Sequence, residues 1–215
     1  MKKILLAVFP ALAAAVLALW YYDNSAAPMG SFFADRAGLI MAFGRLAGII
    51  GALGVMGQLL VMSRAAWLEP LTGPGLPVKW HHRAGLAIPL ALLVHPPLVV
   101  WHHALQSEIP FVEQYFSTLR WAYVPAAALG EALIIAAVAL SLPFARRRLA
   151  YGAWHKIHLA IYAGLALSIG HQLEIGGDLS AEKPYFAWAW YSLLSFTAAN
   201  AAWYRLIKPR LERAA

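Results

Sequence analysis

The stretch "KWHHRAGLAIPLALLVHPPLVVWHH", residues 79–103, decides the class of fold, because it places five histidines in an otherwise apolar segment. Its length and composition are those of a membrane-spanning helix. Histidines at the two ends of such a helix can lie at a headgroup boundary, but His95 lies inside the run "LAIPLALLVHPPLVV". Ionisable groups within a membrane are costly and usually mark functional sites. The partner of His95 is therefore the first thing to look for in the rest of the chain.

The composition of the whole chain is that of an integral membrane protein. Of its 215 residues, 61% are hydrophobic and 13% are charged, whereas globular domains have about 45–50% apolar and about 25% charged residues. Backbone amides in lipid need partners within their own segment, so we expect each apolar segment to be a helix. The sequence predicts an all-α integral membrane six-helix bundle, with residues 1–215 as a single transmembrane domain. The six predicted segments are about 4–22, 38–62, 80–104, 119–143, 154–172 and 185–206.

The charged residues predict the orientation of the bundle. Most Lys and Arg residues fall in connections on the side of the N-terminus, and most acidic residues fall on the other side. The positive-inside rule then predicts that both termini are cytoplasmic. We expect a protein that crosses the bacterial inner membrane several times. The net charge of +7 is explained by this topology and by attraction to anionic lipid, so no nucleic-acid partner is expected.

The first segment and the absence of cysteine each carry a smaller expectation. Residues 4–22 have the look of a signal peptide, but the apolar run is long and "SAAPM" at 25–29 is a poor cleavage site, so we expect a retained helix. The chain has no cysteine, which excludes disulfides, thiolate metal sites and thiol catalysis. Redox chemistry carried by a cofactor is not excluded.

All eight histidines lie in the third and fifth predicted helices, and four of them form a pattern. The 14-residue step from His81 to His95 is about 1400°, about 40° short of four turns, so both project from nearly one face about 21 Å apart along the axis. In the fifth helix His158 and His171 are 13 residues, or about 20 Å, apart. Both helices enter the membrane from the same side. His81 therefore shares a level with His158, and His95 shares a level with His171.

Two neutral imidazoles that face each other across a bundle are the ligand set of a bis-histidine haem iron. A zinc site prefers four clustered ligands, so the pattern predicts two stacked b-type haems and no catalytic side chain. His82 is the alternative to His81, because it also lies 13 residues before His95, but the helical-face argument favours His81. The 13-residue step of the fifth helix is about 140° from whole turns, which requires a local distortion or two haems rotated relative to each other. The remaining histidines lie beside tryptophans near helix ends, where interfacial solvation is the ordinary role: His102, His103 and His155.

The second predicted helix carries two features near these levels. Its glycines, in "GRLAGIIGALGVMGQ" at 44–58, are typical of close helix packing and would equally suit the flat face of a porphyrin. Arg45 lies near the expected depth of His95 and His171 and needs an anion. Haem propionates would supply it, which makes Arg45 a cofactor-binding candidate. The alternative is an ion pair with Glu131 or a bond to a carbonyl.

The same residues resemble a known family. "WHHRAGLAIPLALLVHP" resembles the third helix of the ferric reductase-like transmembrane domain, and "RRRLAYGAWHKIHLAIYAGLALSIGH" resembles its fifth helix. "GRLAGIIGALGVMGQLLVMSR" resembles the second, so the resemblance covers about residues 38–175 of a core at about 38–206. The family includes ferric reductases, NADPH oxidases and the haem subunit of bacterial methionine sulfoxide reductase systems. The resemblance implies transmembrane electron transfer by a haem-dependent oxidoreductase component, with His81 and His158 on the inner haem iron and His95 and His171 on the outer.

The resemblance also sets expectations about partners. In the fused reductases a flavin- and nicotinamide-binding domain follows the last helix, but no glycine-rich dinucleotide fingerprint occurs here. FAD and NAD(P)H are therefore expected only through a partner, a cytoplasmic flavoprotein reductase, with a quinol as the alternative donor. The acceptor is expected on the periplasmic side. One alternative is delivery of electrons to a periplasmic oxidoreductase such as a methionine sulfoxide reductase, and another is a transporter that uses the histidine pairs for a transition metal or protons.

Overall fold

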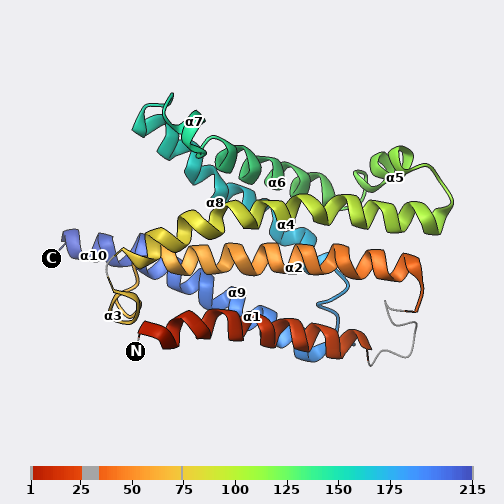
Figure 1. The fold of residues 1–215 in the computed structure, drawn as a ribbon, viewed down its shortest axis with the longest axis horizontal. Coiled ribbons are helices and arrows are strands. Elements are labelled where there is room, and N and C mark those ends of the chain that lie inside the picture. The colour runs from red at the N-terminus through yellow and green to blue at the C-terminus, as the bar shows by residue number, and fades with distance from the viewer. Residues whose placement is uncertain (1, 26–33, 74, 215) are drawn as a thin grey trace.

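The computed structural model describes residues 2–25, 34–73 and 75–214, and these ranges contain helices and connections but no strand (Figure 1). The expectation of an all-α fold is confirmed. The six longest described helices overlap the six predicted segments: α1 (Lys2–Ser25), α2 (Arg36–Met62), α4 (Leu76–Ser107), α6 (Val124–Ala139), α8 (Tyr151–Glu174) and α9 (Pro184–Ala202). Shorter elements connect or follow them: α3 (Glu69–Thr72), α5 (Phe111–Thr118), α7 (Pro143–Arg146), a π-helical turn (Trp203–Ile207) and α10 (Lys208–Ala214).

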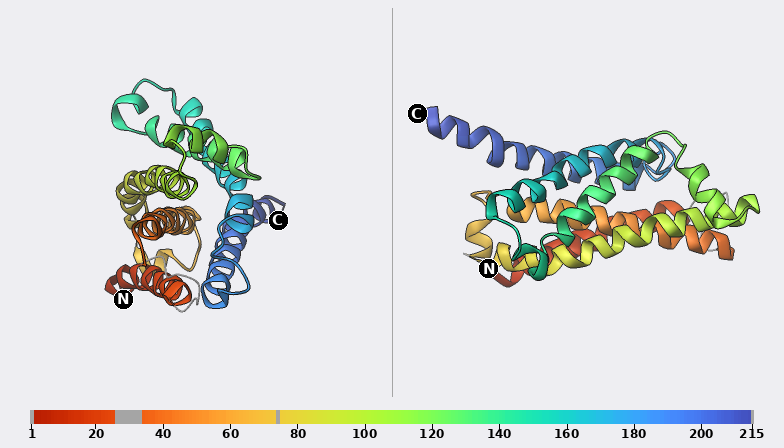
Figure 2. Two further views of the ribbon diagram at one scale, coloured as in Figure 1. Left: turned by 90° about the vertical axis from the view of Figure 1, so that its right-hand side faces the viewer. Right: turned by 90° about the horizontal axis from the view of Figure 1, so that it is seen from above.

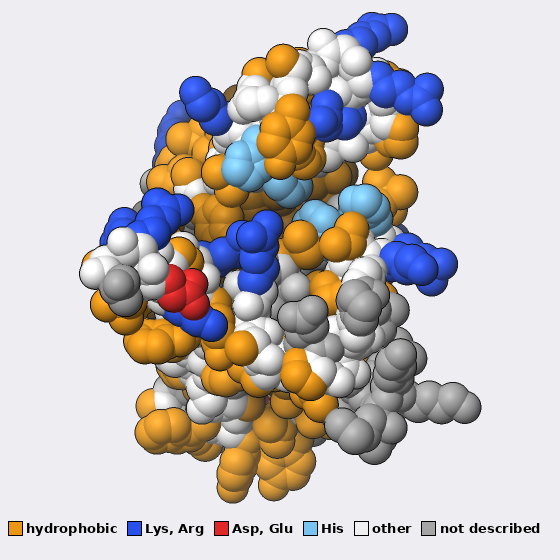
Figure 3. Space-filling model, turned by 90° about the vertical axis from the view of Figure 1, so that its left-hand side faces the viewer, with side chains coloured by type: hydrophobic (Ala, Val, Ile, Leu, Met, Phe, Trp, Pro, Cys, Tyr) orange, Lys and Arg blue, Asp and Glu red, His pale blue; other side chains and the backbone are white. Residues whose placement is uncertain are grey.

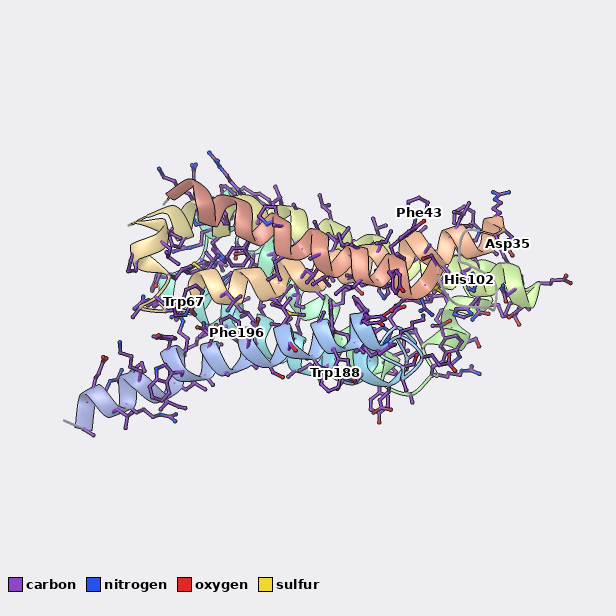
Figure 4. All side chains as sticks on the ribbon, turned by 90° about the horizontal axis from the view of Figure 1, so that it is seen from below. Asp35, Phe43, Trp67, His102, Trp188 and Phe196 are labelled. Carbon is purple, nitrogen blue, oxygen red and sulfur yellow. The ribbon has the colours of Figure 1, made fainter. Side chains whose placement is uncertain are left out.

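Two described helices are long and apolar enough on their own to cross a membrane, namely Arg36–Met62 and Pro77–Ser107. Val124–Ala139 is a shorter apolar helix, and the number of crossings stays a prediction. Large apolar side chains point outward all the same: Phe43 is 61% exposed and Trp188 is 75% exposed (Figure 4). Such a surface is typical of a protein that meets lipid. Four of the five residues of the weak cleavage motif, 26–29, lie outside the described residues.

The helices begin where the sequence supplies suitable residues. The Asp35 side chain accepts a hydrogen bond from the Gly38 backbone N–H at 2.6 Å and so caps α2. A proline stands in the first turn of α4, α6 and α9, where its missing N–H costs nothing. Three prolines also lie inside α4, and the two that directly follow His95, Pro96 and Pro97, each remove one backbone hydrogen bond near that histidine.

The long helices run back and forth between two ends of the molecule. α1, α4 and α8 begin at the end where α2, α6 and α9 finish, and both chain termini lie there (Figure 1). We call it the basic end, defined by Lys79, Arg83 and residues 146–148, and Figure 3 shows Lys and Arg side chains gathered on it. The opposite end is called the far end.

The packing divides the described helices into two halves. In the first half Trp20, Phe186 and Trp190 form a buried core between α1, α2 and α9, and α2 packs along α4. In the second half α6 packs along α8. Few close backbone contacts join α4 to either helix of the second half, which lies across α4 from α2 (Figure 2). We call the boundary between the halves the seam.

Glycines hold the helices of each half close together. A Cβ built on Gly51 would lie 2.5 Å from Leu92 Cδ2, and one on Gly54 would lie 2.5 Å from Ile88 Cγ1, so the glycine stripe of α2 faces α4. The stripe also meets a histidine, because a Cβ on Gly48 would lie 2.8 Å from Nδ1 of His95. The structure supports helix packing for the stripe, and a role beside a porphyrin stays a prediction. In the second half a Cβ on Gly164 would lie 2.6 Å from the Gly130 carbonyl oxygen.

Candidate functional site

The four histidines singled out by spacing meet across the seam as two pairs. The rings of His81 on α4 and His158 on α8 have centroids 5.7 Å apart. Those of His95 on α4 and His171 on α8 have centroids 5.9 Å apart. The first is called the basic-end pair and the second the far-end pair. Each pair takes one histidine from each half of the molecule.

The angle between α8 and α4 explains how His158 and His171, 13 residues apart on α8, can each face a histidine of α4. α8 is a continuous helix over Tyr151–Glu174, and it passes α4 obliquely (Figure 1). A helix that crosses its neighbour turns a different face toward it at each level. The local distortion considered from the sequence is therefore not required.

The spacing within each pair fits a single metal ion between the rings. Bonds from a metal to imidazole nitrogen are about 2.0–2.1 Å long, and a ring nitrogen lies about 1.1 Å from the ring centroid, so two rings on opposite sides of one ion have centroids about 6.3 Å apart. The observed separations of 5.7 and 5.9 Å are close to this value. The sparse backbone contact between α4 and α8 also suits a flat group in the seam. In the described residues no group of three or more potential ligands gathers, so each level is a two-histidine set.

Hydrogen bonds determine which ring nitrogen is available in three of the four histidines. Nδ1 of His95 lies 2.8 Å from the Gly44 carbonyl oxygen. A carbonyl only accepts, so Nδ1 carries the proton and Nε2 keeps its lone pair. Nδ1 of His81 lies 2.6 Å from Gln58 Oε1, and Nδ1 of His158 lies 3.2 Å from Ser141 Oγ.

His171 differs from the other three. Its Nδ1 is buried and has no hydrogen-bond partner within the described part of the chain. The residues present fit a bis-histidine metal group by ring spacing and by the free Nε2 on three rings. Ligation itself stays a prediction.

The other four histidines do not face a histidine on a second helix. His82 is exposed, and its ring lies 5.9 Å from that of its neighbour His81. His155 is exposed and stacks on Tyr151 at 5.8 Å. The last two are at the far end: His102 donates from Nδ1 to the Ala37 carbonyl at 2.8 Å, and His103 packs edge-on against Trp121 at 4.9 Å. The structure thus brings His81, and not His82, opposite the fifth predicted helix.

Arg45 lies in a charged cluster at the far end. Its Nη1 contacts Asp178 Oδ1 at 2.9 Å, and Lys183 Nζ contacts the same oxygen at 3.1 Å. Lys183 also donates to Asn24 Oδ1 at 2.8 Å. The anion is therefore Asp178, in the connection between α8 and α9, rather than Glu131. The two cations share one carboxylate oxygen, and a role toward a haem propionate stays a prediction.

Sequence reasoning missed two residues that contact the histidines. Gln58 is the one amide in the apolar second segment, a signal that singles it out, but only the fold places it on His81. Ser141 follows the end of α6 and carries no comparable signal. Its Oγ accepts from Trp154 Nε1 at 3.0 Å, and the Trp154 ring stacks on His158 with centroids 5.3 Å apart and planes 19° apart.

Comparison with known families finds one match. The family model described as "Ferric reductase like transmembrane component" matches residues 47–169. The matched span includes His81, His95 and His158, and His171 follows it by two residues. Comparison with curated proteins and with solved structures finds no match.

Proposed function

The chain belongs to the ferric reductase-like transmembrane family, whose members are membrane oxidoreductase components, and we propose that it transfers electrons across a membrane through two bis-histidine b-type haems. The observation that carries the proposal is the pair of cross-helix histidine contacts, with ring centroids 5.7 and 5.9 Å apart. Among the residues that the structure describes, neither level gathers a third ligand that would favour a different metal.

The roles of the residues follow from their positions. His81 and His158 would hold the group at the basic end, and His95 and His171 would hold the group at the far end. A haem bound between two imidazoles supplies one-electron chemistry, with a potential set by its ligands and surroundings. The protein supplies neutral axial ligands and, near the far end, two cations, Arg45 and Lys183, as candidates for propionate binding.

The donor is proposed to act at the basic end. Figure 3 views this end and shows histidine side chains in a hollow bordered by Lys and Arg side chains. Positive charge there supports both a cytoplasmic orientation and attraction of a partner with an acidic surface. We therefore assign a cytoplasmic flavoprotein reductase as donor, with FAD and NAD(P)H on that partner, a quinol as the alternative donor, and an acceptor on the periplasmic side.

The optical spectrum tests the proposal. The purified chain, reduced with dithionite, is expected to show b-type haem bands, and a haem assay is expected to give two haems per chain. A chain expressed with adequate haem supply that purifies folded and without porphyrin would contradict the proposal.

Removal of one far-end ligand tests the assignment by level. His171→Ala is expected to lower the haem content from two to one per chain, because a single imidazole at that level leaves the iron without its second axial ligand. His155→Ala is the matched control, since His155 lies on the same helix but is exposed and stacks on Tyr151. Equal haem loss in both variants would count against the assignment.

A further inference from the structure

Two side chains contact the Nδ1 atoms of the basic-end pair: Gln58 contacts His81, and Ser141 contacts His158. We propose that both are positioning residues: each accepts the Nδ1–H of one histidine, holds the neutral ring in that tautomer, and so leaves Nε2 as the nitrogen for a metal. The proposal rests on the proposed function for its redox consequence, but the tautomers follow from hydrogen-bond geometry alone.

The hydrogen bonds around Ser141 leave one arrangement of protons. Ser141 Oγ lies 2.7 Å from the Ala137 carbonyl oxygen, and because a carbonyl only accepts, the hydroxyl proton is used there. The Trp154 indole N–H only donates, so it donates to Oγ at 3.0 Å. The contact of 3.2 Å to His158 can then only be a bond from Nδ1–H to the remaining lone pair of Oγ. The stacked Trp154 ring holds the same imidazole on its face.

The contacts of Gln58 determine the tautomer of His81 in a similar way. Its Oε1 lies 2.6 Å from Nδ1 of His81, and its Nε2 makes a long contact of 3.5 Å with the His81 backbone carbonyl. If the amide were reversed, its oxygen would face that carbonyl, and two acceptors would oppose each other. The observed orientation therefore makes Oε1 the acceptor and Nδ1 of His81 the donor.

The far-end pair is held differently within the described residues. His95 donates to the backbone carbonyl of Gly44, which no substitution removes, and His171 Nδ1 has no partner there. Among the described residues, only the basic-end histidines have their Nδ1 atoms hydrogen-bonded to side chains, which a substitution can remove. Hydrogen bonds of this kind orient a ligating histidine and raise its basicity, and their loss typically costs about 10–100-fold in metal affinity.

Loss of the hydrogen bond to Nδ1 should weaken the binding of oxidised iron more than the binding of reduced iron. An imidazole that donates from Nδ1 is richer in electrons and favours the higher oxidation state, so removal of the acceptor raises the reduction potential. Each tenfold of preferential loss in the oxidised state corresponds to about 59 mV for a one-electron couple. We expect Ser141→Ala and Gln58→Leu each to raise the potential of one haem and to leave the other in place.

The experiment uses the full-length chain purified in detergent, with two readouts. A spectroscopic redox titration gives the two potentials, and NMR of the chain labelled with 15N-histidine shows which ring nitrogens carry protons. Ser141→Thr keeps a hydroxyl and is expected to restore both readouts. Ser168→Ala is the matched control, because Ser168 Oγ donates to the Gly164 carbonyl at 2.9 Å and contacts no histidine nitrogen in any described hydrogen bond.

Each outcome decides the proposal. A potential shift confined to one haem, with Nδ1 of His158 losing its fixed proton in Ser141→Ala, supports it. Unchanged tautomers and potentials in both Ser141→Ala and Gln58→Leu, or equal shifts in Ser168→Ala, overturn it. If Ser141→Ala does not fold, Gln58→Leu decides on its own. A chain without haem contradicts the proposed function, whereas the 15N readout still tests the tautomers.

Discussion

His81 and His82 are adjacent, yet a helix turns consecutive side chains about 100° apart. Only the ring of His81 faces His158, at 5.7 Å, whereas His82 is exposed. We therefore expect His81→Ala to remove the basic-end haem and leave about half of the haem content. His82→Ala should retain both haems, and a haem assay with the reduced spectrum measures the difference.

One outcome of these two substitutions would contradict the observed orientation of α4. If His82→Ala loses a haem while His81→Ala retains two, the helix is rotated by about one residue from the arrangement described here. Unfolding temperature, measured for both variants, separates loss of a ligand from loss of the fold.

At the scale of single residues, the sequence predicted the histidines and missed most of what surrounds them. Two-level spacing identifies the four ring partners because the level of a residue depends only on helical rise. The contact of Arg45 with Asp178 joins residues 133 apart in the chain, and no local pattern encodes such a distance. The bond from His158 to Ser141 likewise depends on how α6 lies against α8. Partners of this kind become visible only when the helices are packed.

At the scale of elements, the apolar segments predicted the helices well and their crossing poorly. Segment lengths and end residues place six helices within a few residues of their observed bounds. The oblique passage of α8 across α4 depends on how the two halves of the molecule pack, and hydrophobicity alone does not specify that. The 140° mismatch of the fifth helix therefore remained a difficulty until the crossing was known.

The contact between Gly130 on α6 and Gly164 on α8 holds these two helices close together and offers a test. A Cβ on Gly164 would lie 2.6 Å from the Gly130 carbonyl oxygen and 2.9 Å from Ile134 Cγ1, so the helices must move apart. We expect Gly164→Ala to lower the free energy of unfolding by about 1–3 kcal/mol and to lower the haem content, because α8 carries His158 and His171. Thermal unfolding and a haem assay measure the two effects.

Gly152 supplies the matched control on the same helix. A Cβ there meets no atom within 4 Å, so Gly152→Ala should be neutral or slightly stabilising, since alanine favours a helix more than glycine does. A loss of stability as large for Gly152→Ala as for Gly164→Ala would show that the backbone contact is not the cause.

At the scale of the whole molecule, the distribution of charge predicts how the donor arrives. Arg147 and Arg148 are exposed beside the first turn of α8, at the end where the His81–His158 pair lies. We expect Arg147→Glu with Arg148→Glu to slow reduction by a flavoprotein by about tenfold or more at low salt, because steering by charge acts on the rate of encounter. Stopped-flow haem reduction at several salt concentrations measures this effect.

Arg120→Glu is the control for charge, because Arg120 is exposed at the other end of the bundle. It changes the net charge without changing the face that the donor approaches. The double variant should also depend less on ionic strength, because less attraction is left for salt to screen. Equal rates for the double variant and the unaltered chain at low salt would contradict docking at this face.

The seam has a consequence for biogenesis. Each histidine pair takes one member from α4 and one from α8, while few close backbone contacts join those two helices. A ligand that binds the folded but not the unfolded arrangement adds its binding free energy to stability. Bis-histidine groups in the seam would therefore stabilise the contact between two halves that otherwise share few backbone contacts. Cofactor insertion and the final assembly step would then be one event, and the chain made under haem starvation would be the form most open to proteolysis.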